Sequence, residues 1–116
     1  MGFGLIARKA IKDAGAMYGP DCLQVETFAA LRKMWVYKTI TDQAFKEAVT
    51  TLQETRYRKL PSSQLLGRAY ELRHNVGAYD AMYVALAEIL QCPLITTDIR
   101  LSNAPGVRCE IELLAA

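Results

Sequence analysis

Apolar residues recur at spacings of three and four over much of this chain, which predicts a protein dominated by amphipathic helices. Residues 23–38 show this pattern most clearly. A second helix is predicted from Thr41 or Asp42 to about Leu52, and a third over residues 65–76. Residues 5–14 form a shorter predicted helix that ends at Gly15.

The C-terminal part of the chain has a different pattern. Residues 78–90 are apolar nearly all the way round, so we expect this helix to be buried on most sides. Residues 94–97 form a short β-rich run, and residues 107–113 alternate between apolar and charged side chains, as a half-exposed strand does. Helices alternating with short strands predict an α/β sandwich in which helices flank a small, mostly parallel sheet.

Length and composition indicate one soluble domain covering residues 1–116. The chain is 52% hydrophobic and 22% charged, which excludes a disordered tail. It contains no uninterrupted apolar run of about eighteen residues, so we expect no membrane span. Residues 1–9 lack the apolar stretch of a secretory signal, and we expect a cytoplasmic protein whose three cysteines are inert thiols.

Three carboxylates occupy unusual positions. Asp80 lies in the first turn of the most apolar helix, Asp98 directly follows the predicted strand at 94–97, and Glu26 is surrounded by Leu23, Val25 and Phe28. Burying a carboxylate is costly unless it is paired, hydrogen-bonded or bound to a metal. Each also has a simpler interpretation: Asp80 can complement its helix dipole, Asp98 can cap a turn, and Glu26 can be partly exposed.

Three segments resemble a known family. Ala78-Tyr79-Asp80-Ala81-Met82-Tyr83 and Pro93-Leu94-Ile95-Thr96-Thr97-Asp98 resemble the C-terminal half of PIN-domain proteins, specifically the VapC-type toxins of bacteria. Pro20-Asp21-Cys22-Leu23-Gln24-Val25-Glu26 resembles the second acidic motif of that family. The motifs follow the family's order, and the resemblance covers residues from about 5 to 114.

The resemblance implies a metal-dependent endoribonuclease. In this family four acidic residues hold Mg²⁺ or Mn²⁺ at the carboxyl edge of a parallel sheet, and by position Glu26, Asp80 and Asp98 match three of them. Thr96 matches a small hydroxyl residue that accompanies the last aspartate. Carboxylates suit Mg²⁺ because this cation prefers oxygen ligands. Arg32 and Arg100 can either pair with these carboxylates or bind substrate phosphates.

One feature departs from the family pattern. Only 25 residues precede Glu26, and none of them has the pattern of the first strand with its aspartate. We therefore expect an N-terminally shortened PIN-like domain. The resemblance implies an RNA substrate, an antitoxin and a second copy of the chain as partners. The alternative is a non-catalytic shortened domain that binds an antitoxin or dimerises.

Overall fold

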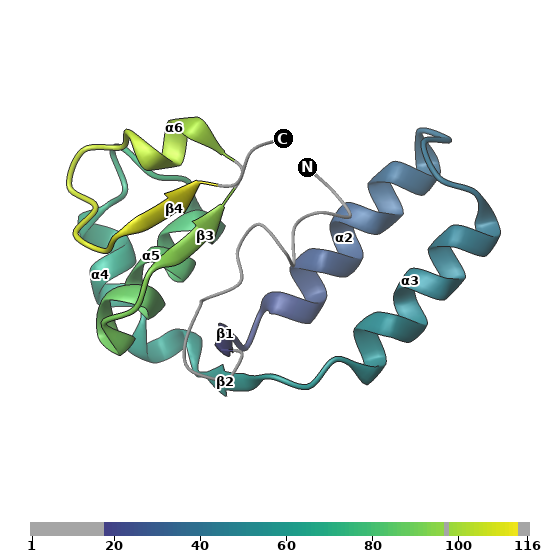
Figure 1. Cartoon of the computed structure of the whole chain (residues 1–116), viewed down its shortest axis with the longest axis horizontal. Helices are drawn as coiled ribbons and strands as arrows, with labels where there is room; N and C mark the ends of the chain where they lie inside the picture. Colours follow the sequence, from purple (N-terminus) through teal and green to yellow (C-terminus); the bar gives the residue numbers. More distant parts are fainter. Residues whose placement is uncertain (1–17, 97, 114–116) are drawn as a thin grey trace.

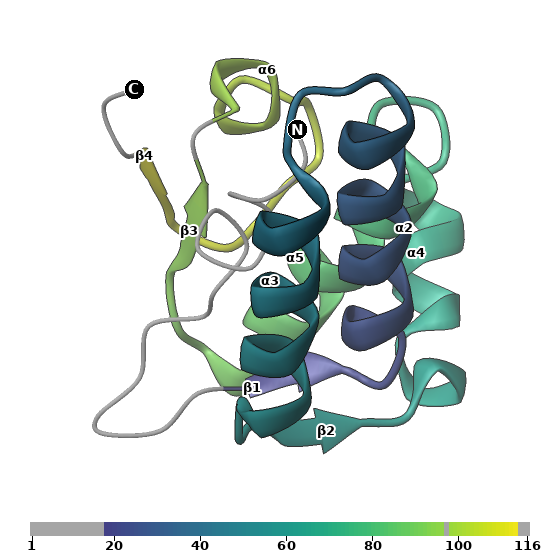
Figure 2. The ribbon, with the colours of Figure 1, turned by 90° about the vertical axis from the view of Figure 1, so that its right-hand side faces the viewer.

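Two long antiparallel helices form a hairpin that stands to one side of the molecule (Figures 1 and 2). They are α2 (Leu23–Val36) and α3 (Asp42–Glu54), close to the predicted positions. Thr41 caps α3, since its hydroxyl accepts a hydrogen bond from Ala44 N at 3.0 Å. Aromatic rings join the two helices: the ring centroid of Phe45 lies 5.7 Å from Phe28 and 5.8 Å from Trp35.

This computed structural model describes residues 18–96 and 98–113. The core surrounds α5 (Ala78–Leu90), in which every residue from Ala81 to Ala87 is buried. The prediction that this helix is buried on most sides is therefore confirmed. Helix α4 (Leu66–Glu71) packs along α5, and Leu94 of the following strand is completely buried beside it.

All strand pairs in the described part of the chain are parallel, as predicted. Strand β1 (Tyr18–Pro20) pairs with β2 (Arg58–Leu60), and β3 (Leu94–Thr96) pairs with β4 (Ile111–Leu113). These pairs form two separate sheets. The short helix α6 (Ile99–Ser102) begins directly after Asp98, so the carboxyl end of β3 leads into a helix N-terminus (Figure 1).

The third predicted helix is shorter than its pattern indicated. Residues 62–64 form the 3-10 helix η2 (Ser62–Gln64), α4 ends at Glu71, and residues 72–76 continue as turns. Backbone hydrogen bonds between residues three positions apart tighten the C-terminal end of α4. The chain continues as Arg-His-Asn-Val at residues 73–76, a stretch of modest helix propensity. Leu72 and Val76 are nevertheless buried, so the apolar spacing predicted their burial correctly.

The predicted strand at 107–113 forms only over its last three residues. Side chains of α4 and α5 bind the backbone just before β4. Arg68 of α4 donates to Gly106 O at 2.6 Å, and Arg108 N donates to Oε2 of Glu88 on α5 at 2.8 Å. These polar groups of the backbone are therefore not paired with β3. Cys109 still packs against the core.

The predicted helix at 5–14 lies outside the described residues. The expectation that no strand with an aspartate precedes Glu26 falls mostly on residues outside the described part; within that part, β1 (Tyr18–Pro20) does form there but contains no aspartate. Within the described ranges, no helix is long and apolar enough to cross a bilayer.

Candidate functional site

Asp80 and Asp98 line one surface pocket, although they are 18 positions apart in the sequence. The pocket has a volume of about 320 Å³ and lies between the N-terminus of α5, the end of β3 and the start of α6. Its other lining residues are Asn75, Val76, Gly77, Arg100 and Leu101. The structure thus brings together two of the three predicted carboxylates.

Asp98 is fixed by hydrogen bonds on both sides. Its side chain accepts a hydrogen bond from Arg100 N at 2.9 Å and so caps α6, while its own N–H donates to Thr96 Oγ1 at 3.0 Å. Thr96 is completely buried. Burial of Asp98 raises its pKa, but hydrogen bonds from the Arg100 backbone and side chain outweigh this effect and hold the pKa below its ordinary value. Asp98 is therefore an anion at neutral pH.

Asp80 is half-buried in the first turn of α5, where the positive end of the helix dipole stabilises a negative charge. Arg100 lies at the same pocket with a side chain that is 91% exposed, and its Nε is 3.5 Å from Asp98 Oδ1. An exposed ion pair of this length contributes little to stability. The Arg100 guanidinium is thus able to turn toward an anion that enters the pocket.

Glu26 lies in the first turn of α2 and is buried at 8% exposure, so the interpretation as a partly exposed residue is wrong. It contacts the buried Tyr83 of α5. Burial first, and then the charge of Glu26 and a hydrogen bond to its carboxylate, raise the pKa of the Tyr83 hydroxyl. Tyr83 follows Asp80 by three residues on α5, so Glu26 packs about one helical turn away from Asp80 along that helix.

Among residues 18–96 and 98–113, no three carboxylate, thiol or imidazole side chains converge into a group that could hold a metal ion. Glu26 does not line the pocket of Asp80 and Asp98. Arg32 lies on the exposed side of α2 and is likewise absent from the pocket lining. The described site is therefore a pair of carboxylates with one arginine at its edge.

The sequence-family model of the PIN domain matches residues 3–107, which is most of the chain. The chain belongs to the PIN-domain family. Curated relatives of this PIN domain are named as VapC ribonucleases of Mycobacterium tuberculosis. Ribonuclease VapC1 is 41% identical over 96 residues, which are 82% of this chain and 72% of the relative.

Two further relatives from Mycobacterium tuberculosis support the same assignment to a VapC-type PIN domain. Ribonuclease VapC12 is 37% identical over 99 residues, covering 85% of this chain and 77% of the relative. Ribonuclease VapC9 is 33% identical over 101 residues, covering 87% of this chain and 80% of the relative. No solved structure shows significant similarity.

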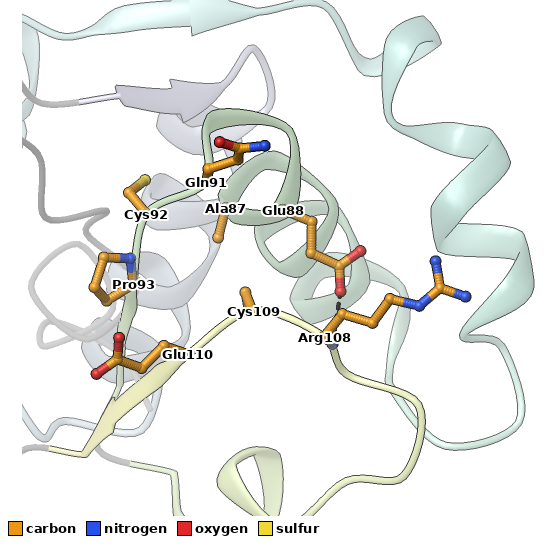
Figure 3. Close-up of a pocket in the computed structure, with 8 residues that line it drawn as sticks. All are labelled: Ala87, Glu88, Gln91, Cys92, Pro93, Arg108, Cys109 and Glu110. Atoms are coloured by element: carbon orange, nitrogen blue, oxygen red, sulfur yellow. Dashed lines mark hydrogen bonds between the residues drawn. The ribbon is translucent and has the colours of Figure 1, made fainter.

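A second pocket of this PIN domain contains none of the predicted site residues (Figure 3). The Glu88 carboxylate at its wall is held by Arg68 Nε at 2.6 Å and by Arg108 N at 2.8 Å. Arg68 therefore joins α4, α5 and the segment before β4. Burial raises the pKa of the Cys109 thiol in this pocket to about 11, so the thiol is protonated and unreactive at neutral pH.

Sequence reasoning missed two residues that position parts of the PIN domain. Tyr83 is 1% exposed and contacts Glu26. Asp21 accepts hydrogen bonds from the backbone and hydroxyl of Ser62, which join the start of α2 to the end of β2. The apolar neighbours of Tyr83 were a usable signal for its burial, whereas no local pattern indicated the Asp21–Ser62 contact.

Proposed function

We propose that this chain is a VapC-type endoribonuclease that hydrolyses RNA phosphodiester bonds with a divalent cation held at Asp80 and Asp98. The observation that carries the proposal is the meeting of these two carboxylates in one pocket. The similarity of most of the chain to proteins named ribonucleases supports it. A pocket that is open to solvent suits a polymeric substrate, because the chain of an RNA must pass through it.

The donor set of the pocket fits Mg²⁺ or Mn²⁺. Asp80 and Asp98, two of the three predicted ligands, line the pocket, and both are carboxylates, the oxygen donors that Mg²⁺ prefers. When bound, Mg²⁺ lowers the pKa of a water and offsets negative charge on the phosphate. Asp98 supports such binding, since its lowered pKa keeps it anionic well below neutral pH.

The other site residues have supporting roles in this proposal. Thr96 holds the backbone of Asp98, and Arg100 orients a substrate phosphate at the edge of the pocket. Glu26, the third predicted ligand, does not line the pocket, and in this proposal its contact with Tyr83 positions the turn that carries Asp80. We also propose that the exposed Arg32 binds the RNA backbone at a distance from the reacting bond.

The test is cleavage of labelled RNA by the purified chain with Mg²⁺ or Mn²⁺, with EDTA as the metal-free control. Asp80→Asn and Asp98→Asn should abolish cleavage. Asparagine is also a good N-cap, so Asp98→Asn leaves α6 capped and isolates the loss of charge. Asp42→Asn is the matched control, because Asp42 also lies in the first turn of a helix but outside the pocket.

Equal cleavage by all three variants, or cleavage that persists in EDTA, would contradict the proposed site. Cleavage that disappears in Asp80→Asn and Asp98→Asn but persists in Asp42→Asn supports it. Circular dichroism of each variant checks that the loss does not come from unfolding.

The partners proposed for this chain are an RNA substrate, a cognate antitoxin and a second copy of itself in the cytoplasm. The relatives are named VapC ribonucleases, which supports the first two. Exposed apolar side chains on the α2–α3 hairpin support a protein partner: Val25 is 71% exposed and Tyr37 is 72% exposed. Sedimentation of the purified chain tests the homodimer.

A second function is favoured by one observation. The pocket holds only two carboxylates, and the described residues contain no group of three acids that could hold a metal. A PIN domain that binds an antitoxin or dimerises without cutting RNA is consistent with such a site. Failure of the folded chain to cleave RNA with either cation would favour this alternative.

A further inference from the structure

A second groove opens next to the pocket of Asp80 and Asp98. It has a volume of about 690 Å³, and the two hollows share Val76 and Gly77 as lining residues. Tyr79 lines the groove, while the next residue, Asp80, lines the pocket. Because consecutive helical residues point about 100° apart, one turn of α5 contributes a side chain to each hollow.

Two tyrosines in this groove are unusually exposed. Tyr70 is 65% exposed and Tyr79 is 53% exposed, whereas Tyr83, about one turn after Tyr79 on α5, is buried. Exposed aromatic rings offer flat faces on which unpaired nucleic-acid bases stack. Tyr79 precedes Asp80 on α5, and the groove shares Val76 and Gly77 with the pocket, so a strand bound at the carboxylates can extend into the groove.

Arg73 gives this groove a positive charge. Its guanidinium carbon lies 4.0 Å from the ring centroid of Tyr70, and its Nη1 donates to Tyr70 O at 2.9 Å. Arg73 therefore holds the Tyr70 ring in place by a cation–π contact, and its guanidinium also offers a hydrogen-bond donor for a phosphate. The described lining residues of the groove include no carboxylate. The groove is complementary to an anion that carries aromatic bases.

We propose that Tyr70, Tyr79 and Arg73 form a binding platform for single-stranded RNA, on which unpaired bases stack as the strand enters the Asp80–Asp98 pocket. This inference rests on the proposed function, because it assigns the part of the substrate that such a nuclease must hold. Paired bases in a duplex are already stacked on one another, so the platform selects unpaired nucleotides.

The test measures RNA binding without catalysis. Fluorescence anisotropy in EDTA gives the affinity of the whole chain for a labelled single-stranded RNA of about ten nucleotides. Tyr70→Ala and Tyr79→Ala should each weaken binding about tenfold, while Tyr70→Phe and Tyr79→Phe should keep near-wild-type affinity, since stacking needs the ring and not the hydroxyl. Tyr37→Ala is the matched control, because Tyr37 is 72% exposed but lies at the end of α2, outside the groove.

Arg73→Gln gives an independent signature. It should weaken binding and also make the salt dependence of the affinity shallower, because one phosphate contact is lost. A hairpin RNA with the same nucleotides paired should bind more weakly and respond less to the tyrosine substitutions. Unchanged melting temperatures would show that the exposed tyrosine variants are folded.

Wild-type affinity of both alanine variants for single-stranded RNA would overturn the proposal. This is the result expected if the groove binds a protein segment and not RNA. The proposed nuclease activity is tested separately. If the tyrosines are needed for RNA binding but no cation supports cleavage, the platform stands and the nuclease proposal falls. If the chain cleaves RNA and the tyrosine variants match wild type in binding and KM, the platform falls and the nuclease proposal stands.

Discussion

The backbone N–H of Asp98 donates a hydrogen bond to the buried hydroxyl of Thr96 at 3.0 Å. This contact fixes the chain where β3 ends and α6 begins, and it therefore orients the Asp98 carboxylate relative to Asp80. A buried hydroxyl that holds the backbone of a neighbouring acid is a positioning residue. Loss of this hydroxyl is expected to lower both the activity and the stability.

Thr96→Val should show both effects. Valine keeps the volume of threonine but leaves the Asp98 N–H without its acceptor, which costs about 1–3 kcal/mol of unfolding free energy. We expect RNA cleavage at saturating cation to fall about 10- to 100-fold, as for other residues that support metal ligands. Thr96→Ser is the control, because it keeps the hydroxyl; equal cleavage rates in the two variants would contradict the role of Thr96.

The buried Tyr83 predicts a loss of stability at alkaline pH. Its pKa in the folded protein lies above the ordinary value of 10.0, so the unfolded chain releases this proton first. The free energy of unfolding should therefore be fully retained below about pH 10 and fall above it by about 1.4 kcal/mol per pH unit for this group. Urea unfolding between pH 8 and pH 11 measures this slope.

Tyr83→Phe should reduce that alkaline slope, while Tyr70→Phe, a change at an exposed ring, serves as the control. The substitution also removes the partner of Glu26 and should lower the rate of RNA cleavage without abolishing it. An alkaline slope that is identical in wild type and Tyr83→Phe would rule out Tyr83 as its source.

The lowered pKa of Glu88 predicts that the free energy of unfolding falls at acid pH. Although burial raises its pKa, hydrogen bonds from Arg68 and Arg108 N outweigh that effect and lower the pKa below 4.5. Its contribution to stability is therefore present above about pH 4.5 and is lost as the pH falls below that value. Unfolding measured at pH 7 and at pH 3 should show this loss.

Glu88→Gln should lower the free energy of unfolding at neutral pH by about 1–3 kcal/mol, because Arg68 loses its charged partner in a largely buried place. Glu71→Gln is the matched control. Glu71 also binds Arg68, at 3.2 Å, but its side chain is 61% exposed, so its removal should change stability by less than about 0.5 kcal/mol. Equal effects of the two substitutions would contradict the structural role of Glu88.

Residue patterns predicted the long elements well and the short ones poorly. Helices α2, α3 and α5 have apolar spacings that extend over three or more turns, and their positions were predicted closely. Strands β1 and β2 were missed, because each has three residues and is defined by backbone pairing across 40 positions of sequence, with Tyr18 opposite Arg58. No periodicity can appear in so short a segment, and Gly19-Pro20 has the composition of a turn.

The candidate site was predictable only in part. The meeting of Asp80 and Asp98 was predictable because each lies at the end of a predicted element, and such ends gather at one edge of a parallel α/β fold; their role as ligands stays a prediction. Glu26 was expected to join them, and its role as a ligand stays a prediction. Its contact with Tyr83 depends on how α2 packs against α5, which no local spacing specifies.

Binding of Mn²⁺ to the folded chain tests the central claim most directly, because it requires neither the correct RNA nor a partner. Electron paramagnetic resonance of free Mn²⁺ should show binding by wild type and by Asp42→Asn, and a loss of binding in Asp80→Asn and Asp98→Asn. Added Mn²⁺ should raise the melting temperature of the first two proteins only. Equal binding by all four proteins, or no binding by folded wild type, would contradict a cation site at Asp80 and Asp98.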